Sequence, residues 1–178
     1  MADDAAAPGA RRPDLGTEEG RRKFIGILNS RLPKKRNIAQ GLVRNERGEI
    51  LLCELAYKKE WDLPGGVVDP KESPATCVRR EISEELGVEW PVGQLRAVNW
   101  LPPYRGWDDA VLCLFDLGER PADVVAGMTL LAKEIKAVHW CPPEELGEHV
   151  APYVARMLGS VLAAGPGTVY LEDGLPRA

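Results

Sequence analysis

The spacing of apolar residues divides the chain into a short helical part and a longer part rich in strands. Apolar residues between Phe24 and Leu32 recur three or four positions apart, the spacing of one helix face. Thr17 precedes them as a candidate N-cap, and Pro33 ends the run. Later runs are short and apolar and are separated by turn residues, as in strands. The predicted strands are residues 38–44, 50–57, 95–100, 110–117, 135–141 and, after a weakly defined stretch, 168–171.

Two further segments have helical spacing and clear end signals. Ser73 and Pro74 form an N-cap followed by proline at the first helical position, and Gly87 is typical of a helix C-terminus. A second helix is expected to begin at residues 142–146 and to continue through Val154 and Leu158. Strands and helices are mixed without a regular βαβ rhythm, so we expect an α+β fold or a three-layer α/β/α sandwich.

The same pattern suggests how the chain is organised. Residues 1–16 have almost nothing to bury and are expected to form a disordered N-terminal tail. Residues 17–33 form an N-terminal helix, residues 34–163 the main domain, and residues 164–178 a C-terminal tail. The N-terminal helix is also a candidate surface for forming a homodimer.

Composition narrows the classes of function. The 178 residues are 44% hydrophobic and 28% charged, which is ordinary for a globular protein, and the net charge is −4. A general nucleic-acid-binding protein would be basic, so that class is disfavoured. No apolar run approaches the length of a membrane span. Four separate cysteines without zinc-site spacing, and no apolar secretory segment, favour the cytoplasm.

The helix after Ser73 carries an unusual concentration of acid. At about 100° per residue, Glu81, Glu84 and Glu85 fall within an arc of about 100° beside the apolar face. Like charges at this spacing repel by roughly 0.2–0.5 kcal/mol per pair, and the negative end of the helix dipole adds to the cost. Gly65 and Gly66 precede the helix and let backbone oxygens approach a ligand. Carboxylate and carbonyl oxygens together suit Mg²⁺ or Mn²⁺, which would relieve the repulsion.

Spacing across this region resembles the complete signature of the Nudix hydrolases. Gly66 is followed after five residues by Glu72 and after seven more by Arg80-Glu81-Ile82-Ser83-Glu84-Glu85-Leu86-Gly87-Val88. The resemblance implies an α+β fold, an α/β/α sandwich with a mixed β-sheet. It also implies cleavage of the diphosphate linkage in a nucleoside diphosphate joined to another moiety, by in-line attack of a metal-activated water on phosphorus.

The resemblance also assigns roles to residues. The Gly65 carbonyl and the carboxylates of Glu81, Glu84 and Glu85 would be ligands of Mg²⁺ or Mn²⁺. Gly66, Glu72, Arg80 and Gly87 would be structural members of the motif. The general base would come from the motif itself, through Glu81 or Glu84, or from a later loop, where Glu134 is the candidate. Glu134 is otherwise a loop acid beside two lysines.

Contacts to the substrate are less constrained by the sequence. The candidates are Arg44, Lys58 and Arg105 for phosphates and Trp61 for stacking on a base, although solvated surface or packing would also explain these residues. The expected partner is a small nucleotide-type diphosphate. Alternative functions are a nucleoside triphosphate pyrophosphohydrolase, including one that removes oxidised nucleotides, or a nucleotide sensor without catalysis. Sensors tend to have lost the acidic residues of the motif, whereas this chain retains all three.

Overall fold

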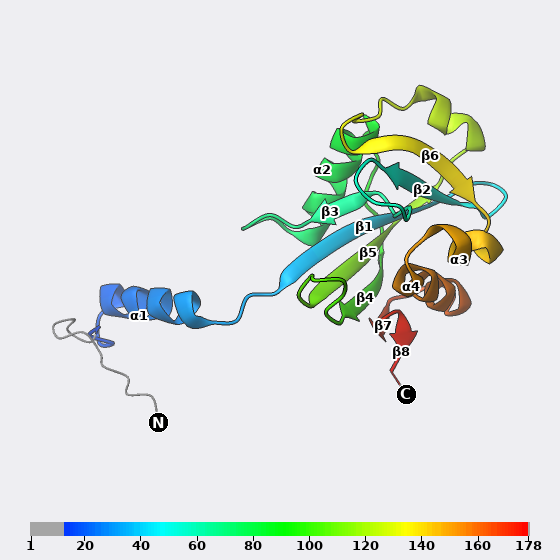
Figure 1. Ribbon diagram of the computed structural model, residues 1–178. Helices are drawn as coiled ribbons and strands as arrows, with labels where there is room; N and C mark the ends of the chain where they lie inside the picture. The colour runs from blue at the N-terminus through cyan, green and yellow to red at the C-terminus, as the bar shows by residue number, and fades with distance from the viewer. Residues whose placement is uncertain (1–12, 178) are drawn as a thin grey trace. The chain divides into compact units, whose positions relative to one another are not determined.

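One helix lies in the described part of the N-terminal unit, residues 13–34. The structure is a computed structural model that describes residues 13–177, and the chain divides into two compact units, one ending at Lys34 and the other beginning at Lys35 (Figure 1). The first unit contains α1 (Glu18–Arg31), and the Thr17 hydroxyl caps it by accepting a hydrogen bond from the Gly20 N–H. Much of the tail expected at residues 1–16 lies outside the described residues. The apolar side chains of α1 are exposed within this unit, and dimerisation through them stays a prediction.

The second unit is built on one mixed sheet. Its strands are β1 (Arg36–Arg44), β2 (Ile50–Leu55), β3 (Gly65–Val67), β4 (Leu95–Leu101), β5 (Ala110–Glu119), β6 (Ile135–Cys141), β7 (Val169–Glu172) and β8 (Leu175–Pro176). Their order is β6-β2-β1-β5-β4-β7-β8, with β3 paired to β1. The β1–β5 and β4–β7 pairs are parallel and the other pairs antiparallel. The expected α+β fold with a mixed sheet is therefore confirmed.

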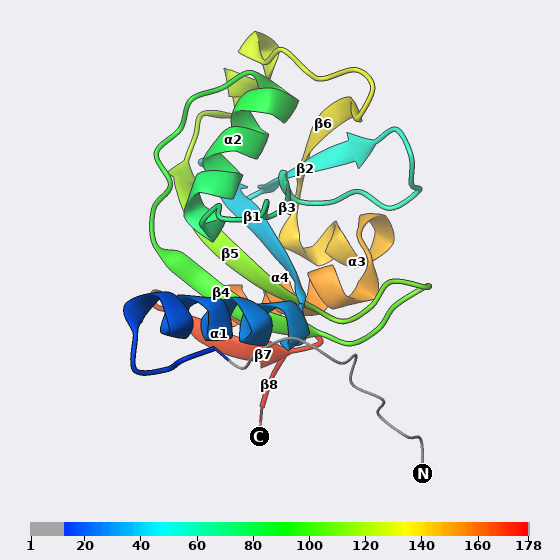
Figure 2. The ribbon, with the colours of Figure 1, turned by 90° about the vertical axis from the view of Figure 1, so that its left-hand side faces the viewer.

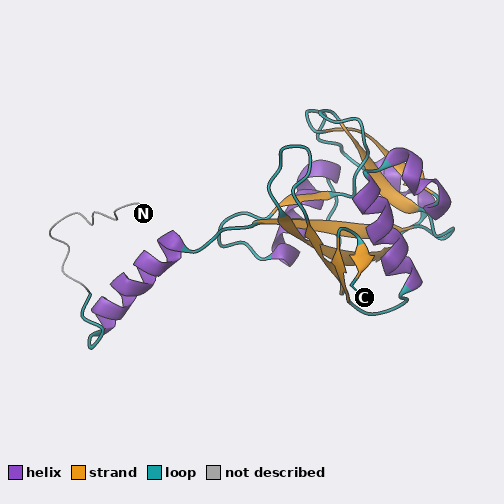
Figure 3. Ribbon diagram, turned by 60° about the horizontal axis from the view of Figure 1, so that its bottom comes forward, coloured by secondary structure: helices purple, strands orange, loops and turns teal. Residues whose placement is uncertain are grey.

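Helices cover both faces of the sheet. They are α2 (Pro74–Leu86), α3 (Leu146–His149) and α4 (Pro152–Ala163), with 3₁₀ turns at η1 (Ala122–Gly127) and η2 (Pro143–Glu145). In Figure 2, α2 lies in front of the sheet and α4 behind it, and Figure 3 shows helices on both sides of the strands. Alternate residues of β1 serve the two faces: Val43 packs in the core under α2, and Leu42 packs in the core under α4. Among the described residues, no helix is both long and apolar enough to cross a membrane.

Two segments differ from the sequence-based expectations. The continuous helix predicted from residue 142 is wrong, because the chain forms η2, α3 and α4 instead. Val150 and Ala151 are extended before Pro152, which disfavours helical backbone in the residue before it. Residues beyond 163, expected as a tail with one strand, form β7 and β8, and β7 pairs in parallel with β4.

Candidate active site

Helix α2 presents its acidic side chains in a fixed orientation because both ends are capped and one face is buried. The Ser73 hydroxyl accepts a hydrogen bond from the Thr76 N–H at 3.2 Å, and Gly87 ends the helix in the left-handed region at φ 67°. Val78, Ile82 and Leu86 are fully buried against the sheet. Rotation of α2 is therefore set by its packing, and the neighbouring acidic face is turned toward β3.

The three carboxylates of this face occupy different environments. Glu85 is 6% exposed, and its Oε2 accepts a hydrogen bond from the Gly65 N–H at 2.9 Å. Glu81 is half-buried and lies directly over the backbone of Gly66, where an added Cβ would come within 2.4 Å of its Oε1. Glu84 is exposed and bonds to Arg80. Two of the carboxylates thus lie against the glycine strand, and the third faces solvent.

Arg80 holds the loop before α2 to the helix. Its Nε and Nη2 donate to the two oxygens of Glu72, each at 3.0 Å, and its Nη1 donates to Glu81 at 2.9 Å and to Glu84 at 3.2 Å. The guanidinium of Arg80, with the Asp69 N–H, lowers the pKa of the Glu72 carboxyl to about 2. The loop acid is therefore ionised whenever the protein is near neutral pH.

Burial has the opposite effect on the carboxylates at the glycine strand. Burial, together with the charges of Glu81 and Glu134, raises the pKa of Glu85 to about 8 against the opposing effect of the hydrogen bond from Gly65. Burial also raises the pKa of Glu81, and Glu84 and Glu134 contribute to that increase. Glu134, which forms an ion pair with Lys133 at 3.2 Å, thus lies within electrostatic range of the acidic face. These acids are poorly solvated and mutually repulsive, a state that a cation would relieve.

A pocket of about 630 Å³ opens beside the glycine strand, on the face of the sheet that α4 covers. Gly65, Gly66 and Val67 form the end nearest α2. Most of the lining is apolar or aromatic, with a few charged groups, as in sites that bind small molecules. The aromatic lining residues are Tyr57, Tyr104, Trp107 and Tyr153.

The four predicted substrate contacts separate into two pairs. Lys58 and Arg105 line the pocket, where Lys58 pairs with Asp62 at 2.5 Å and Arg105 pairs with Glu60 at 2.7 Å. Arg44 does not line it and pairs with Asp116 at 3.5 Å.

Trp61 is also placed outside the lining. Its ring is stacked between His139 and His149, with ring centroids 4.0 Å and 4.1 Å apart. These contacts, together with its packing against the apolar core, occupy both faces of the ring.

Several polar residues of the pocket were not singled out from the sequence. Gln40 and Asp62 are buried in its wall, and the Gln40 Nε2 donates to Asp62 Oδ1 at 2.8 Å. Arg36 contributes a guanidinium that lies over the Trp107 ring, 4.6 Å from its centroid. Asp173 reaches the pocket from the turn between β7 and β8. Only Asp62 carried a local signal, since it directly precedes Leu63-Pro64-Gly65-Gly66.

Comparisons with known proteins agree with this geometry. The NUDIX domain family model matches residues 34–160. The chain is 33% identical over 127 residues to a MutT-like protein of Streptomyces ambofaciens, covering 71% of this chain and 77% of the relative. It is 50% identical over 117 residues to a putative 8-oxo-dGTP diphosphatase of Bacillus subtilis, covering 66% of this chain and 73% of that relative. The solved structure of a MutT protein from Methanosarcina mazei matches with a TM-score of 0.56 and 30% identity, covering 69% of this chain and 90% of that one. The chain therefore belongs to the Nudix family and is a Nudix hydrolase.

Proposed function

We propose that this protein hydrolyses the diphosphate linkage of a nucleoside diphosphate joined to another moiety, by in-line attack of water on phosphorus. The observation that carries the proposal is the position of Glu81 and Glu85 against Gly65 and Gly66. These two glycines, and not the glutamates, line a pocket large enough for a nucleotide. Nucleotides are the substrates of the Nudix family, and the acidic motif is complete in this chain.

The donor set fits a hard divalent cation. Among residues 13–177, no three His, Cys, Asp or Glu side chains are already gathered around one point. The fit rests instead on chemistry. Burial raises the pKa of both Glu81 and Glu85, and the charge of Glu81 adds to the increase at Glu85. Both acids lie beside a glycine strand, where the missing Cβ of Gly66 leaves room for the Glu81 carboxylate. We propose that Glu81, Glu84, Glu85 and the Gly65 carbonyl hold Mg²⁺ or Mn²⁺.

Different residues of the chain have separate proposed roles in the reaction. A bound divalent cation would neutralise phosphate oxygens and acidify a water molecule. The proton of the attacking water passes to a carboxylate, for which Glu81, Glu84 and Glu134 are the candidates. Lys58 and Arg105 are available at the pocket wall to orient the anionic substrate. The apolar walls exclude bulk water around the rest of the nucleotide.

A nucleoside triphosphate cut to the monophosphate is the second candidate substrate. The 8-oxo-dGTP diphosphatase name of the relative that is 50% identical supports it. A sensor without catalysis is disfavoured because Glu81, Glu84 and Glu85 are all retained. The two candidate substrates would place the same protein residues around one phosphoanhydride linkage. They differ in the group attached on the far side of that linkage.

A substrate panel with product identification tests the proposal. Nucleotide sugars, ADP-ribose, dinucleoside polyphosphates and triphosphates, including oxidised ones, would be incubated with Mg²⁺ or Mn²⁺ in ¹⁸O-labelled water. Release of a nucleoside monophosphate, with the label in one product phosphate, supports the proposal and identifies the phosphorus attacked. Binding of nucleotides without product formation over hours would instead identify a sensor.

A further inference from the structure

The pocket is lined by residues from β3, β1, β5 and β4 and from the turn after β7. It is therefore long enough to contact a substrate group far from the cleaved linkage. Along one row of the sheet, Gly66 pairs with Ala39 in β1, and the register continues through β5 and β4 to Tyr170 in β7. Four spacings of about 4.8 Å place Tyr170 roughly 19 Å from Gly66. The turn that follows Tyr170 carries Asp173 into the pocket lining. Asp173 therefore lies at the opposite end of the pocket from the carboxylates of α2.

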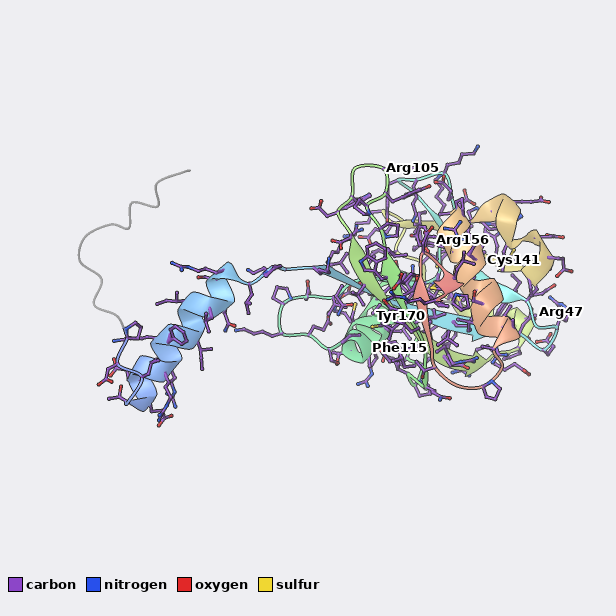
Figure 4. The ribbon with its side chains drawn as sticks, turned by 90° about the horizontal axis from the view of Figure 1, so that it is seen from below. Arg47, Arg105, Phe115, Cys141, Arg156 and Tyr170 are labelled. Carbon is purple, nitrogen blue, oxygen red and sulfur yellow. The ribbon has the colours of Figure 1, made fainter. Side chains whose placement is uncertain are left out.

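Hydrogen bonds from two elements, β4 and α4, fix the turn that carries Asp173. The Asp173 N–H donates to the Trp100 carbonyl at 2.8 Å, and Arg156 Nε donates to the Asp173 carbonyl at 2.8 Å. The Gly174 N–H donates to Asn99 Oδ1 at 3.0 Å, and Ser160 Oγ donates to the Gly174 carbonyl at 2.8 Å. Arg156 projects from α4, where Figure 4 labels it. Contacts from both β4 and α4 thus fix the position of this turn.

Asp173 adopts a backbone conformation that the surrounding contacts must maintain. Its φ of 52° is in the left-handed region, which Asp and Asn tolerate better than most residues. Gly174 follows at φ 83°, and a Cβ there would lie 2.6 Å from the Tyr153 carbonyl. Strained residues that several elements hold in place are concentrated at ligand-binding positions.

One oxygen of the Asp173 carboxylate is left for a ligand. Oδ2 forms an ion pair with Arg156 Nη2 at 2.6 Å, and the Asp173 side chain is 47% exposed. Oδ1 has no hydrogen-bond partner among the described residues and is accessible from solvent. An ionised carboxylate only accepts hydrogen bonds, so a matching ligand group must be an N–H or O–H donor. The family model ends at residue 160, before Asp173.

We propose that Asp173 determines specificity by accepting a hydrogen bond from an N–H or O–H group at the end of the substrate remote from the cleaved phosphoanhydride. This inference rests on the proposed hydrolysis of nucleotide diphosphate linkages. The donor is an amino group of the base in a triphosphate substrate, or a hydroxyl of the sugar in a nucleotide sugar. The Arg156 contact restrains the carboxylate of this lining residue.

Asp173→Asn is the informative variant because Asn tolerates the left-handed backbone. Arg156 can only donate, so the new amide must turn its oxygen toward Arg156 and its NH₂ toward the pocket. The substitution thus replaces an acceptor by a donor without changing the shape of the wall. Glu172→Gln is the matched control: it makes the same charge change one residue earlier, where the side chain contacts Tyr170 and Arg177 rather than the pocket.

Paired substrates separate the two sources of the donor. The base arm compares GTP with ITP, which lacks the amino group, and the sugar arm compares a nucleotide sugar with the methyl ester of the same nucleoside diphosphate. For the pair that Asp173 reads, the Asn variant should raise KM for the donor-bearing member by about 10- to 100-fold with kcat little changed. Preference within that pair should fall or reverse, while Glu172→Gln keeps the wild-type ratio.

Equal effects on both members of each pair, or equal effects of the two variants, would overturn the role of Asp173. If the wild-type protein hydrolyses nothing, the proposed function fails separately. Calorimetric binding of the same nucleotides then decides the inference, because Asp173→Asn should weaken binding of donor-bearing nucleotides and Glu172→Gln should not. Unchanged melting temperatures of both variants show that the turn is intact.

Discussion

Replacing each of the two adjacent glycines by alanine should separate folding from catalysis. At Gly66, the added Cβ would meet the Glu81 Oε1 at 2.4 Å, whereas ordinary contact begins near 3.4 Å. The backbone of Gly66 is outside the left-handed region, and the obstructing atom belongs to the end of a flexible side chain. We therefore expect Gly66→Ala to fold normally and to displace the Glu81 carboxylate by about 1 Å.

The displacement should appear in turnover. A misplacement of about 1 Å in a catalytic constellation lowers the rate by roughly 100-fold, or about 2.7 kcal/mol in activation free energy. Gly65→Ala should behave differently, because its Cβ would lie 2.3 Å from the Ala39 carbonyl and its φ is 135°. Backbone cannot move aside as a side chain can, so we expect a loss of unfolding free energy of about 2 kcal/mol or more.

The assay measures kcat in saturating Mg²⁺ and the unfolding midpoint for both variants and for Gly147→Ala. Gly147 is a suitable control because nothing lies within 4 Å of its added Cβ. The reasoning is refuted if Gly66→Ala keeps more than half of wild-type turnover. It is refuted equally if Gly66→Ala unfolds as easily as Gly65→Ala, since Glu81 would then not have given way.

Four further outcomes are expected around the acidic face. The double variant Glu84→Gln/Glu85→Gln should lose metal-dependent turnover while its melting temperature stays equal or rises, because repulsion on α2 falls; unchanged hydrolysis would remove the mechanism. Chelation with EDTA should abolish activity and added Mg²⁺ or Mn²⁺ should restore it, and activity that persists in EDTA would contradict the proposed cation. Glu134→Gln should lower kcat by about 10²- to 10⁴-fold if Glu134 is the base, and a wild-type pH–rate profile with full kcat assigns the base to the motif. Because the pKa of Glu72 is lowered, its pair with Arg80 stabilises the fold above about pH 4.5, and this contribution is lost as the pH falls toward about 2. Denaturant titration of wild type and Glu72→Gln measures the difference in their unfolding free energies. That difference should shrink between about pH 4.5 and 2 and should stay constant above that range.

The elements that depend on local signals could be predicted from the sequence. The caps at Ser73 and Gly87 place α2 within its observed bounds, because capping involves only neighbouring backbone groups. The break before Pro152 does not follow from apolar spacing, because that spacing continues on both sides of it; its only signal is the proline itself. Strand ends were displaced by up to two residues, because pairing with a distant partner decides where a strand stops.

The unequal burial of the three glutamates could not be predicted from helical spacing. Spacing alone places Glu81, Glu84 and Glu85 on one face, and it does not say which part of that face another strand covers. The β3 strand covers Glu85 and half of Glu81, and it leaves Glu84 in solvent. The residues of the pocket wall are even harder to predict from the sequence. Gln40 and Asp173 are 133 positions apart along the chain, and only the order of strands in the sheet brings both into the lining of one pocket.

Arg80 explains how α2 tolerates so much acid before any ligand is present. Two of its nitrogens form a bidentate pair with Glu72, which fixes the loop, and the remaining Nη1 serves both Glu81 and Glu84. One guanidinium thus connects the loop before α2 to two of the carboxylates on the acidic face of that helix. Glu85 receives no such help from Arg80. Burial raises its pKa to about 8, and the hydrogen bond from the Gly65 N–H offsets only part of that increase. Of the carboxylates on this face, Glu85 therefore has the most to gain from a cation.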